Sequence, residues 1–516
     1  MSQILRIFRK DLKHHWPEIA ILLAVLVTYT WKEPSLRNPE EMIFAGAAGV
    51  LWRFLPQMLL LAWGLLIVRV VQGESLVGDR QFWVTRPYEW PKLLAAKVLF
   101  ILALVNVPWF IAQMILLARA GFPPEAHVIG LIRLQLLISA ILFLPAVTAA
   151  VVTSTVLQVC LVALGLGLYG IAAGSLGNEI PNSHMDSGAS FVEPLTSALI
   201  LGTCILAILW QYARRRTWQS RAALICLAAV MVIIDVATPY GRMIARAYPE
   251  PSNGQEPSAK FALLAPDNWD ASFRSPGVAM IKLPLRVSGV ASASVVGIKG
   301  IFVTVEDADG FRWESHWLPQ YGLLWPDSTN WDAEFNLDKK IFDRVASVPV
   351  NAHISFALTS YHEEDERTVV VTREFSMQGM GNCALPQRWG ISVSCRSPLT
   401  TPRLIATLEA TQITCAPRPG MQAPTGQARA TEGNWDAASD NVEPGIDPIV
   451  TFSFAFSSNT FSLSSNKMTT NPPIFWETCP GTPITLWTPR FEGRSRAELD
   501  VKSIRLGDYE QKLREN

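Results

Sequence analysis

The stretch LLAAKVLFILALVNVPWFIAQMILL, Leu93–Leu117, decides how the first half of this chain folds. Lys97 is its single charged residue, and Pro108 is its single proline. A helix that crosses the hydrocarbon core of a bilayer needs roughly 17 to 25 predominantly apolar residues. The stretch meets that requirement, so we expect it to span a membrane as a helix.

Comparable apolar runs lie on both sides of this stretch, up to about residue 238. The six further runs are Trp16–Trp31, Leu55–Val71, Ile129–Val151, Val156–Ala173, Leu195–Trp210 and Ala222–Ala237. The first run is short for a span, and the runs that begin at Ile129 and Val156 nearly fuse, so six or eight spans remain alternatives to seven. We therefore predict an α-helical multi-pass membrane domain over residues 16–238.

Residues 1–15 predict an amphipathic helix that precedes the first span. Its apolar and basic side chains fall on opposite helical faces. They are Ile4, Leu5, Phe8 and Leu12 on one face and Arg6, Arg9, Lys10 and Lys13 on the other. Such a helix lies at the cytoplasmic interface of a membrane. An equally weighted alternative is a basic flank that only sets the orientation of the first span.

The distribution of Lys and Arg predicts how the chain is oriented, because positively charged residues stay on the cytoplasmic side of a membrane. Basic residues concentrate before the first span, in the connection between the second and third spans, and at Arg214–Arg221. The segment Asn178–Pro194 contains neither Lys nor Arg. We expect a protein of the cytoplasmic (inner) membrane with its N-terminus in the cytoplasm. An odd number of spans then places everything after Ala237 outside the cytoplasm.

Residues 239–516 predict an all-β, sandwich-like extracytoplasmic domain. Short runs of alternating polarity, such as KLPLRVSGV (282–290) and AHISFALTS (352–360), are typical of antiparallel strands. Asp309-Gly310, between the run ending at Val305 and Phe311, is typical of a hairpin turn. Many short strands without long helical patterns favour a β-sandwich. Residues 417–448 are rich in Pro, Gly, Ala and Asp, and we expect a mobile loop there.

The seven cysteines divide between the two halves of the chain. Three lie inside apolar runs, where a lone Cys acts as a small apolar residue. The other four, Cys383, Cys395, Cys415 and Cys479, lie in the predicted β domain. Disulfides form in oxidising compartments, and four cysteines allow three pairings. Short loop length favours Cys383 with Cys395 and Cys415 with Cys479, while four unpaired thiols remain the alternative.

Composition and motifs exclude several classes of function. The 44 basic and 44 acidic residues balance, so no overall field attracts nucleic acid. The sequence has no G-x-x-x-x-G-K-[ST] phosphate loop and no H-E-x-x-H zinc motif. The one His among carboxylates, in YHEED (361–365), fits a solvated turn better than a site. We therefore predict no catalytic site, no metal site and no cofactor.

The polar connection between the second and third spans carries unusually specific residues for a membrane loop. Phe82, Trp83 and Trp90 can supply buried anchoring area, and Pro87 and Pro91 restrict the backbone. Arg80 and Arg86 can pair with acidic side chains at the rim of a partner's groove. Aromatic and Arg side chains dominate the energetic centres of protein interfaces. We interpret the segment as a docking site for a partner. The alternative is an aromatic belt with a positive cytoplasmic flank.

Three segments resemble the type-2 ABC transporter permeases: RIFRKDLKHHW (6–16), GESLVGDRQFWVTRPYEWPKLLAAKVL (73–99) and QYARRRTWQSR (211–221). Glu74, the Arg86-Pro87 step and Lys97 match the pattern of that family, and the resemblance covers residues 4–221. It implies a membrane subunit without ATPase activity of its own, a separate ATP-binding subunit and room for a second permease copy. It also implies that the ATPase grips the cytoplasmic segment between the second and third spans. Together with the docking interpretation, this makes Glu74, Arg80, Phe82, Trp83, Arg86 and Pro87 the expected coupling residues.

The chain departs from the usual six-span plan of that family by its seventh span and its large β domain. Those departures favour a second hypothesis beside transport. In that hypothesis the chain is a membrane-anchored extracytoplasmic binding or envelope-assembly protein without transport activity.

Overall fold

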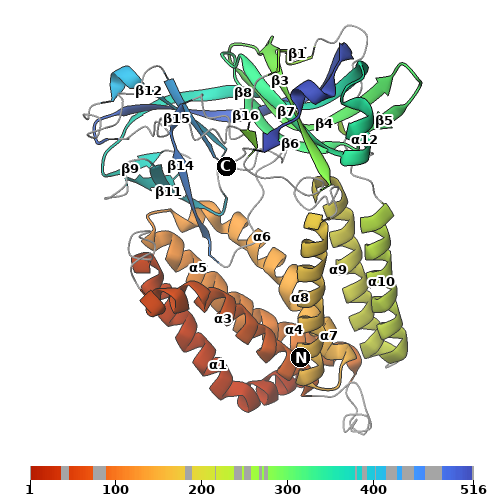
Figure 1. Ribbon diagram of the computed structural model, residues 1–516. Helices are drawn as coiled ribbons and strands as arrows, with labels where there is room; N and C mark the ends of the chain where they lie inside the picture. The colour runs from red at the N-terminus through yellow and green to blue at the C-terminus, as the bar shows by residue number, and fades with distance from the viewer. Residues whose placement is uncertain are drawn as a thin grey trace.

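The computed structural model describes most of the chain. The described residues are 2–36, 46–73, 89–179, 189–214, 217–237, 247–248, 257–266, 270–271, 277–377, 381–385, 392–400, 403–413, 427–432, 447–458 and 479–513. Helices occupy the first half and strands the second, and in Figure 1 the strands lie over one end of the helices.

Every predicted apolar run lies within a helical stretch. The elements are α1 (Ser2–Leu36), α3 (Gly46–Gln72), α4 (Trp90–Ile101), η2 (Leu102–Asn106), α5 (Val107–Arg119), η3 (Pro124–His127), α6 (Val128–Ile138), η4 (Ser139–Phe143), α7 (Leu144–Val152), α8 (Val156–Glu179), α9 (Ala189–Arg214) and α10 (Thr217–Ala237). Elements α4 to α5 form one continuous helical span, and η3 to α7 form the next.

Within the described part of the chain, three helices are long and apolar enough to cross a membrane. They are Leu55–Gln72, Trp90–Arg119 and Pro124–Val152. Two shorter apolar helices, Val156–Gly165 and Ala198–Arg214, lie in α8 and α9. These helices indicate that the protein associates with a membrane, while the predicted count of seven spans stays a prediction.

Two of the long spans contain π-helical segments, η2 and η4, each just before a proline. Pro108 follows η2, and Pro145 follows η4. A proline inside a helix lacks the N–H that would bond four residues back, and its ring clashes with that carbonyl. Widening the preceding turn relieves the clash, so both π segments have a local cause in the sequence.

Helix α1 packs against the other helices along one stripe. Ile7, Asp11, His15, Ile19 and Leu22 are all buried, at spacings of three or four residues. The helix continues without a break through residue 15, so the expected interface helix and the first apolar run form one element. Leu5 was expected on the apolar face of this helix. The buried stripe is centred on Ile7 instead, and Leu5 is 43% exposed.

The β half contains the predicted strands. They are β1 (Lys260–Leu263), β2 (Asp270–Ala271), β3 (Val278–Ser288), β4 (Ser294–Asp307), β5 (Arg312–Glu314), β6 (Leu318–Leu324), β7 (Asn330–Asp338), β8 (Val350–Val370), β9 (Glu374–Met377), β10 (Gly381–Ala384), β11 (Ser392–Pro398), β12 (Leu404–Glu409), β13 (Gln427–Glu432), β14 (Ile449–Ala455), β15 (Ser457–Ser458), β16 (Pro483–Ile504) and β17 (Lys512–Leu513). A short helix, α12 (Lys339–Val345), follows β7, and two 3₁₀ turns, η5 (Ala410–Gln412) and η6 (Leu506–Tyr509), complete the elements.

The strands form two sandwiches that share one large sheet, in the order β15-β13-β12-β16-β8-β4-β5 with β6 beside β4. The sheet β1-β3-β7 packs over β4 and one half of β8 and β16 around one hydrophobic core. The sheet β14-β11-β10-β9 packs over β12, β13 and the other half of β16 around a second core. The predicted single sandwich is therefore two, joined by strands of 21 and 22 residues.

The β8–β16 pairing shifts register where the chain passes between the two sandwiches. Asp365 in β8 has a φ of 55°, and the register shifts between Leu486 and Thr488 on β16. A bulge of this kind bends and twists a strand pair. YHEED (361–365) lies in β8 and pairs with β16 up to this bulge, so the interpretation of this segment as a turn is wrong.

Two other local predictions have different outcomes. The hairpin is confirmed: Val305 pairs with Trp313 across a turn in which Gly310 has a φ of 82° and Asp307 accepts the N–H of Phe311. The loop expected over 417–448 is interrupted by β13, which pairs antiparallel with β12. This strand, QARATE, has few apolar residues, and the buried Ala430 is the side chain it adds to the second core, so its hydrophobic signal is weak.

Candidate functional site

The predicted coupling residues lie outside the described part of the chain. They are Glu74, Arg80, Phe82, Trp83, Arg86 and Pro87, and the structure describes both flanks of their segment. Helix α3 ends at Gln72 on one flank. On the other flank Glu89 is extended, α4 begins at Trp90, and Lys92 Nζ donates to Glu89 Oε1 at 2.8 Å. The candidate site consists of these two flanks and of the side chains that bind them to neighbouring helices.

Lys97 fastens both flanks to helix α1. Its Nζ donates to Asp11 Oδ2 of α1 at 2.8 Å and to the carbonyl of Val70, in the last turn of α3, at 2.9 Å. The two charged side chains are only 3% and 7% exposed. Burying a charge is costly unless it is paired and hydrogen-bonded. The Asp11–Lys97 pair therefore holds three helices in one arrangement next to the predicted coupling segment.

A second link joins α1 to α3. The carboxylate of Glu18 accepts hydrogen bonds from Arg69 in α3 and from the ring nitrogen Nδ1 of His15, the latter at 2.7 Å. Asp11, His15 and Glu18 lie three or four residues apart, so they share the packed face of α1. This face contributes one ionic contact to the end of the second predicted span, Glu18–Arg69, and one to the start of the third, Asp11–Lys97.

Two further contacts extend this set to later helices. Gln72 Nε2 donates to Thr153 Oγ1 at 3.0 Å, just after the end of α7. Arg221 of α10 donates from Nε and Nη2 to the carbonyl of Val152 at 3.0 and 2.9 Å. We call the residues Asp11, Glu18, Arg69, Gln72, Lys97, Thr153 and Arg221 the basal belt. It ties α1, α3, α4, α7 and α10 together at one end of the helices.

The basal belt lies beside an exposed basic face of α1. Arg6, Arg9 and Lys13 are exposed, and Trp16 is 63% exposed on the same helix. In Figure 1 the N-terminus is marked on the part of the helical region that is farther from the strands. This end therefore combines a rigid polar belt with exposed positive charge, and such a surface can receive an acidic partner or anionic lipid headgroups.

The opposite end of the helices contacts the β region. Asn382 Nδ2 of β10 donates to the carbonyl of Ala120, just after α5, at 3.0 Å. Leu399 and Ile449 pack into the hydrophobic core of the helical region. A Cβ atom at Gly130 would lie only 2.2 Å from Leu399 Cδ1, so the absence of a side chain there permits the close approach.

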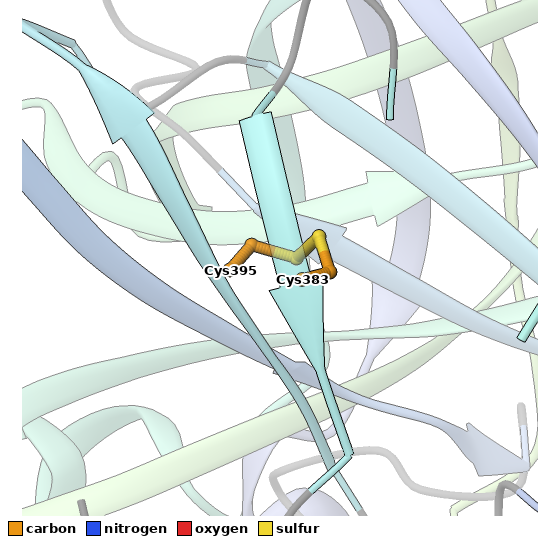
Figure 2. The surroundings of a disulfide bond; sticks show 2 residues. All are labelled: Cys383 and Cys395. Carbon is orange, nitrogen blue, oxygen red and sulfur yellow. A yellow bond between two sulfur atoms is a disulfide. The ribbon is translucent and has the colours of Figure 1, made fainter. Parts of the chain in front are cut away.

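A disulfide crosslinks the strand pair that makes this contact. Cys383 of β10 and Cys395 of β11 are bonded and directly opposite in the antiparallel register, as Figure 2 shows. This is the pairing favoured from loop length. Cys479 is also disulfide-bonded, and Cys415, its expected partner, lies outside the described residues.

One constellation in the β region was missed from the sequence. His353 Nδ1 lies 2.7 Å from Asp500 Oδ1, and its Nε2 lies 3.4 Å from Ser355 Oγ. The residue types are those of a hydrolytic triad, and the i, i+2 spacing of His353 and Ser355 on one strand face was the available signal. Ser355 is buried in the middle of the sheet between β4 and β16. A nucleophile must reach its substrate, so this cluster is structural.

Comparisons with known proteins assign no family to the chain. No protein-family model matches it, and no curated protein sequence matches it. Among solved structures, red sea bream transglutaminase matches with a TM-score of 0.13 and 9% sequence identity. The match covers 48% of this chain and 32% of the transglutaminase chain. A TM-score this low carries no information about fold or activity. Within the described residues, no group of three or more His, Cys, Asp or Glu side chains could hold a metal ion.

Proposed function

We propose that this chain is the membrane-spanning permease subunit of an ABC transporter and is energised by a separate ATP-binding subunit. One observation carries the proposal: the buried Lys97 binds both Asp11 of α1 and the Val70 carbonyl of α3. The two ends of the predicted coupling segment are thereby held to each other and to α1.

This arrangement suits a segment that receives force from a partner. A motion of the segment between Gln72 and Glu89 is passed directly to α3 and α4, which are continuous with it. The buried ion pair passes the same motion to α1, because separating Asp11 from Lys97 leaves a buried charge unpaired. The resemblance to type-2 permeases assigns the gripping role to this segment through Glu74 and Arg86-Pro87, and the docking interpretation adds Arg80, Phe82 and Trp83.

The proposed topology places the basal belt at the cytoplasmic face of the inner membrane and the β region outside the cytoplasm. The exposed Arg6, Arg9 and Lys13 near the belt support this orientation through the positive-inside rule. The Cys383–Cys395 disulfide supports an oxidising compartment for the β region. ATP hydrolysis is assigned to another subunit, since the sequence lacks a phosphate loop.

A second candidate function is a membrane-anchored binding or envelope-assembly protein without transport activity. The observation that favours it is the size of the β region, which contains two hydrophobic cores of its own. In the first proposal this region binds substrate or a partner for the transporter; in the second, its binding is the whole function.

The test is co-purification of an ATP-binding subunit encoded beside this gene. Phe82→Ala with Arg86→Glu should weaken co-purification of the ATPase and transport while membrane insertion stays intact. The matched control is Phe311→Ala with Arg312→Glu, which makes the same chemical change on the β4–β5 hairpin and should leave binding unchanged.

The outcomes separate the two functions. If the ATPase binds and couples normally to the Phe82/Arg86 variant, the coupling role of this segment is wrong. If the neighbouring ATPase fails to bind the wild-type chain in detergent and in nanodiscs, the binding-protein function replaces the transporter.

A further inference from the structure

Four uncharged polar side chains meet near the middle of two long helical spans. Asn106 Nδ2 donates to Ser139 Oγ at 2.8 Å and to Gln135 Oε1 at 3.3 Å, and Gln135 Nε2 donates to Gln113 Oε1 at 2.7 Å. We call Asn106, Gln113, Gln135 and Ser139 the amide cluster. Gln113 and Gln135 are 1% and 8% exposed, so the cluster is largely enclosed by helices.

The cluster coincides with the two π segments. Asn106 is the last residue of η2, and Ser139 is the first residue of η4. A π turn widens the helix and redirects side chains, and such turns are frequent at functional sites. The widening before Pro108 and Pro145 thus brings these two polar residues into contact across the two spans.

Two buried polar atoms at this position lack partners among the described residues. They are Asn106 Oδ1, an acceptor, and Trp109 Nε1, a donor. Trp109 is 3% exposed and lies three residues after Asn106, on the same side of the helix. A polar atom without a partner is costly in the interior of a membrane protein. Polar residues that only join helices should satisfy one another, and these two do not.

We propose that the amide cluster is a water-accessible binding site for an uncharged group that both donates and accepts hydrogen bonds, such as a hydroxyl or a primary amide. Such a group would supply a donor to Asn106 Oδ1 and an acceptor to Trp109 Nε1. The cluster contains amides and a hydroxyl, with the indole of Trp109 beside it, but no ionised side chain, so nothing in it compensates a charged ligand. The inference that the bound group is the transported substrate rests on the proposed transport function. The inference that water reaches the cluster does not.

The experiment measures the reaction rate of an introduced cysteine with water-soluble thiol reagents in nanodiscs. Cys160, Cys204 and Cys226 are first replaced by Ala, and Ser139→Cys is compared with Leu136→Cys on the same helix. Leu136 is 66% exposed on the outer surface of the helices, where lipid covers it in the proposed orientation. The thiolate is the reacting species and forms only in contact with water, so Ser139→Cys should react at least about 10-fold faster.

Two reagents test the class of ligand. The uncharged 2-hydroxyethyl methanethiosulfonate should modify Ser139→Cys faster than the trimethylammonium reagent, after each rate is divided by its rate with a small thiol in water. Asn106→Cys serves as a second reporter if Ser139→Cys does not fold.

Each outcome bears on the proposal. Equal rates at Ser139→Cys and Leu136→Cys would show a dry polar contact between helices and would overturn it. Equal normalised rates with both reagents would overturn the restriction to uncharged groups. None of these measurements uses an ATPase, so they can fail or succeed independently of the coupling test.

Discussion

Asp11 and Lys97 are 86 residues apart in the sequence, yet their carboxylate and ammonium groups lie 2.8 Å apart and almost fully buried. This pair joins the first helix of the chain to the start of the third predicted span. In the proposed transporter, a displacement of the segment before Trp90 would reach α1 through this pair and through Glu18–Arg69.

Replacing Lys97 by Met should strongly destabilise the helical region, because it leaves the Asp11 carboxylate buried without its partner. Breaking one half of a buried ion pair costs about 3 to 5 kcal/mol. The double variant Asp11→Leu with Lys97→Met should recover most of the loss, since both charges are then absent. The measurement is thermal unfolding of the detergent-solubilised chain, with the exposed Lys13→Met as the control. A double variant no more stable than Lys97→Met would show that the pair is not the cause.

Removing the disulfide with Cys383→Ser and Cys395→Ser should destabilise the second sandwich. The bond closes a sequence separation of 12 residues, and a disulfide of this kind contributes roughly 2 to 4 kcal/mol. Guanidinium unfolding with and without reductant measures the loss. Reductant should have a smaller effect on the variant than on the wild type. The control is Cys160→Ser with Cys226→Ser, both free cysteines. Peptide mapping that finds Cys383 and Cys395 as free thiols in the mature protein would contradict the pairing.

The stability of the β region should depend on the ionisation of Glu334. Burial raises the pKa of the Glu334 carboxyl above its ordinary value of 4.5; the nearby Lys282 opposes this shift, and Asp332 adds to it. The folded chain therefore keeps this proton to a higher pH than the unfolded chain does. The contribution of Glu334 to stability falls as pH rises from about 4.5 through its raised pKa, and it is constant above that range.

Glu334→Gln isolates this contribution, because the amide cannot ionise. Wild type and variant should have similar unfolding free energies below about pH 4.5, where Glu334 is protonated in both the folded and the unfolded chain. The variant should become the more stable of the two as pH rises from about 4.5 through the raised pKa of Glu334. Guanidinium unfolding from pH 4 to pH 8 measures the difference. A difference that stays flat or changes in favour of the wild type would contradict the assigned role of burial.

The proposed topology predicts which residues an impermeant thiol reagent reaches on intact cells. Thr329→Cys in the β region should be labelled, and Lys13→Cys beside the basal belt should be labelled only after the cells are opened. Both positions are exposed, so burial does not decide the result. The background lacks the three free cysteines. Labelling of Lys13→Cys on intact cells, or protection of Thr329→Cys, would reverse or refute the orientation.

Features that depend on neighbours in the sequence were predictable. The apolar runs are helical, the turn at Asp309-Gly310 closes a hairpin, and Cys383 pairs with Cys395 across a short connection. The interruptions of the two spans also have local causes in Pro108 and Pro145. Each of these outcomes follows from backbone and side-chain preferences within a few residues, which a single sequence displays directly.

Features that depend on distant partners were decided only by the tertiary structure. Nothing in the pattern around Lys97 indicates that its partner is Asp11, and nothing in β10 indicates that Asn382 binds the carbonyl of Ala120, 262 residues away. The amide cluster likewise exists because packing aligns η2 with η4. The continuity of β8 and β16 across two sandwiches was hidden, since partly exposed polar residues such as His362, Glu363 and Glu364 are held there by pairing with another strand. The amino-acid sequence by itself determined most helices, strands and turns, with YHEED (361–365) and β13 as exceptions. The packing of those segments decided which buried charges and amides meet, because a buried polar group is stable only beside a partner that the fold brings to it.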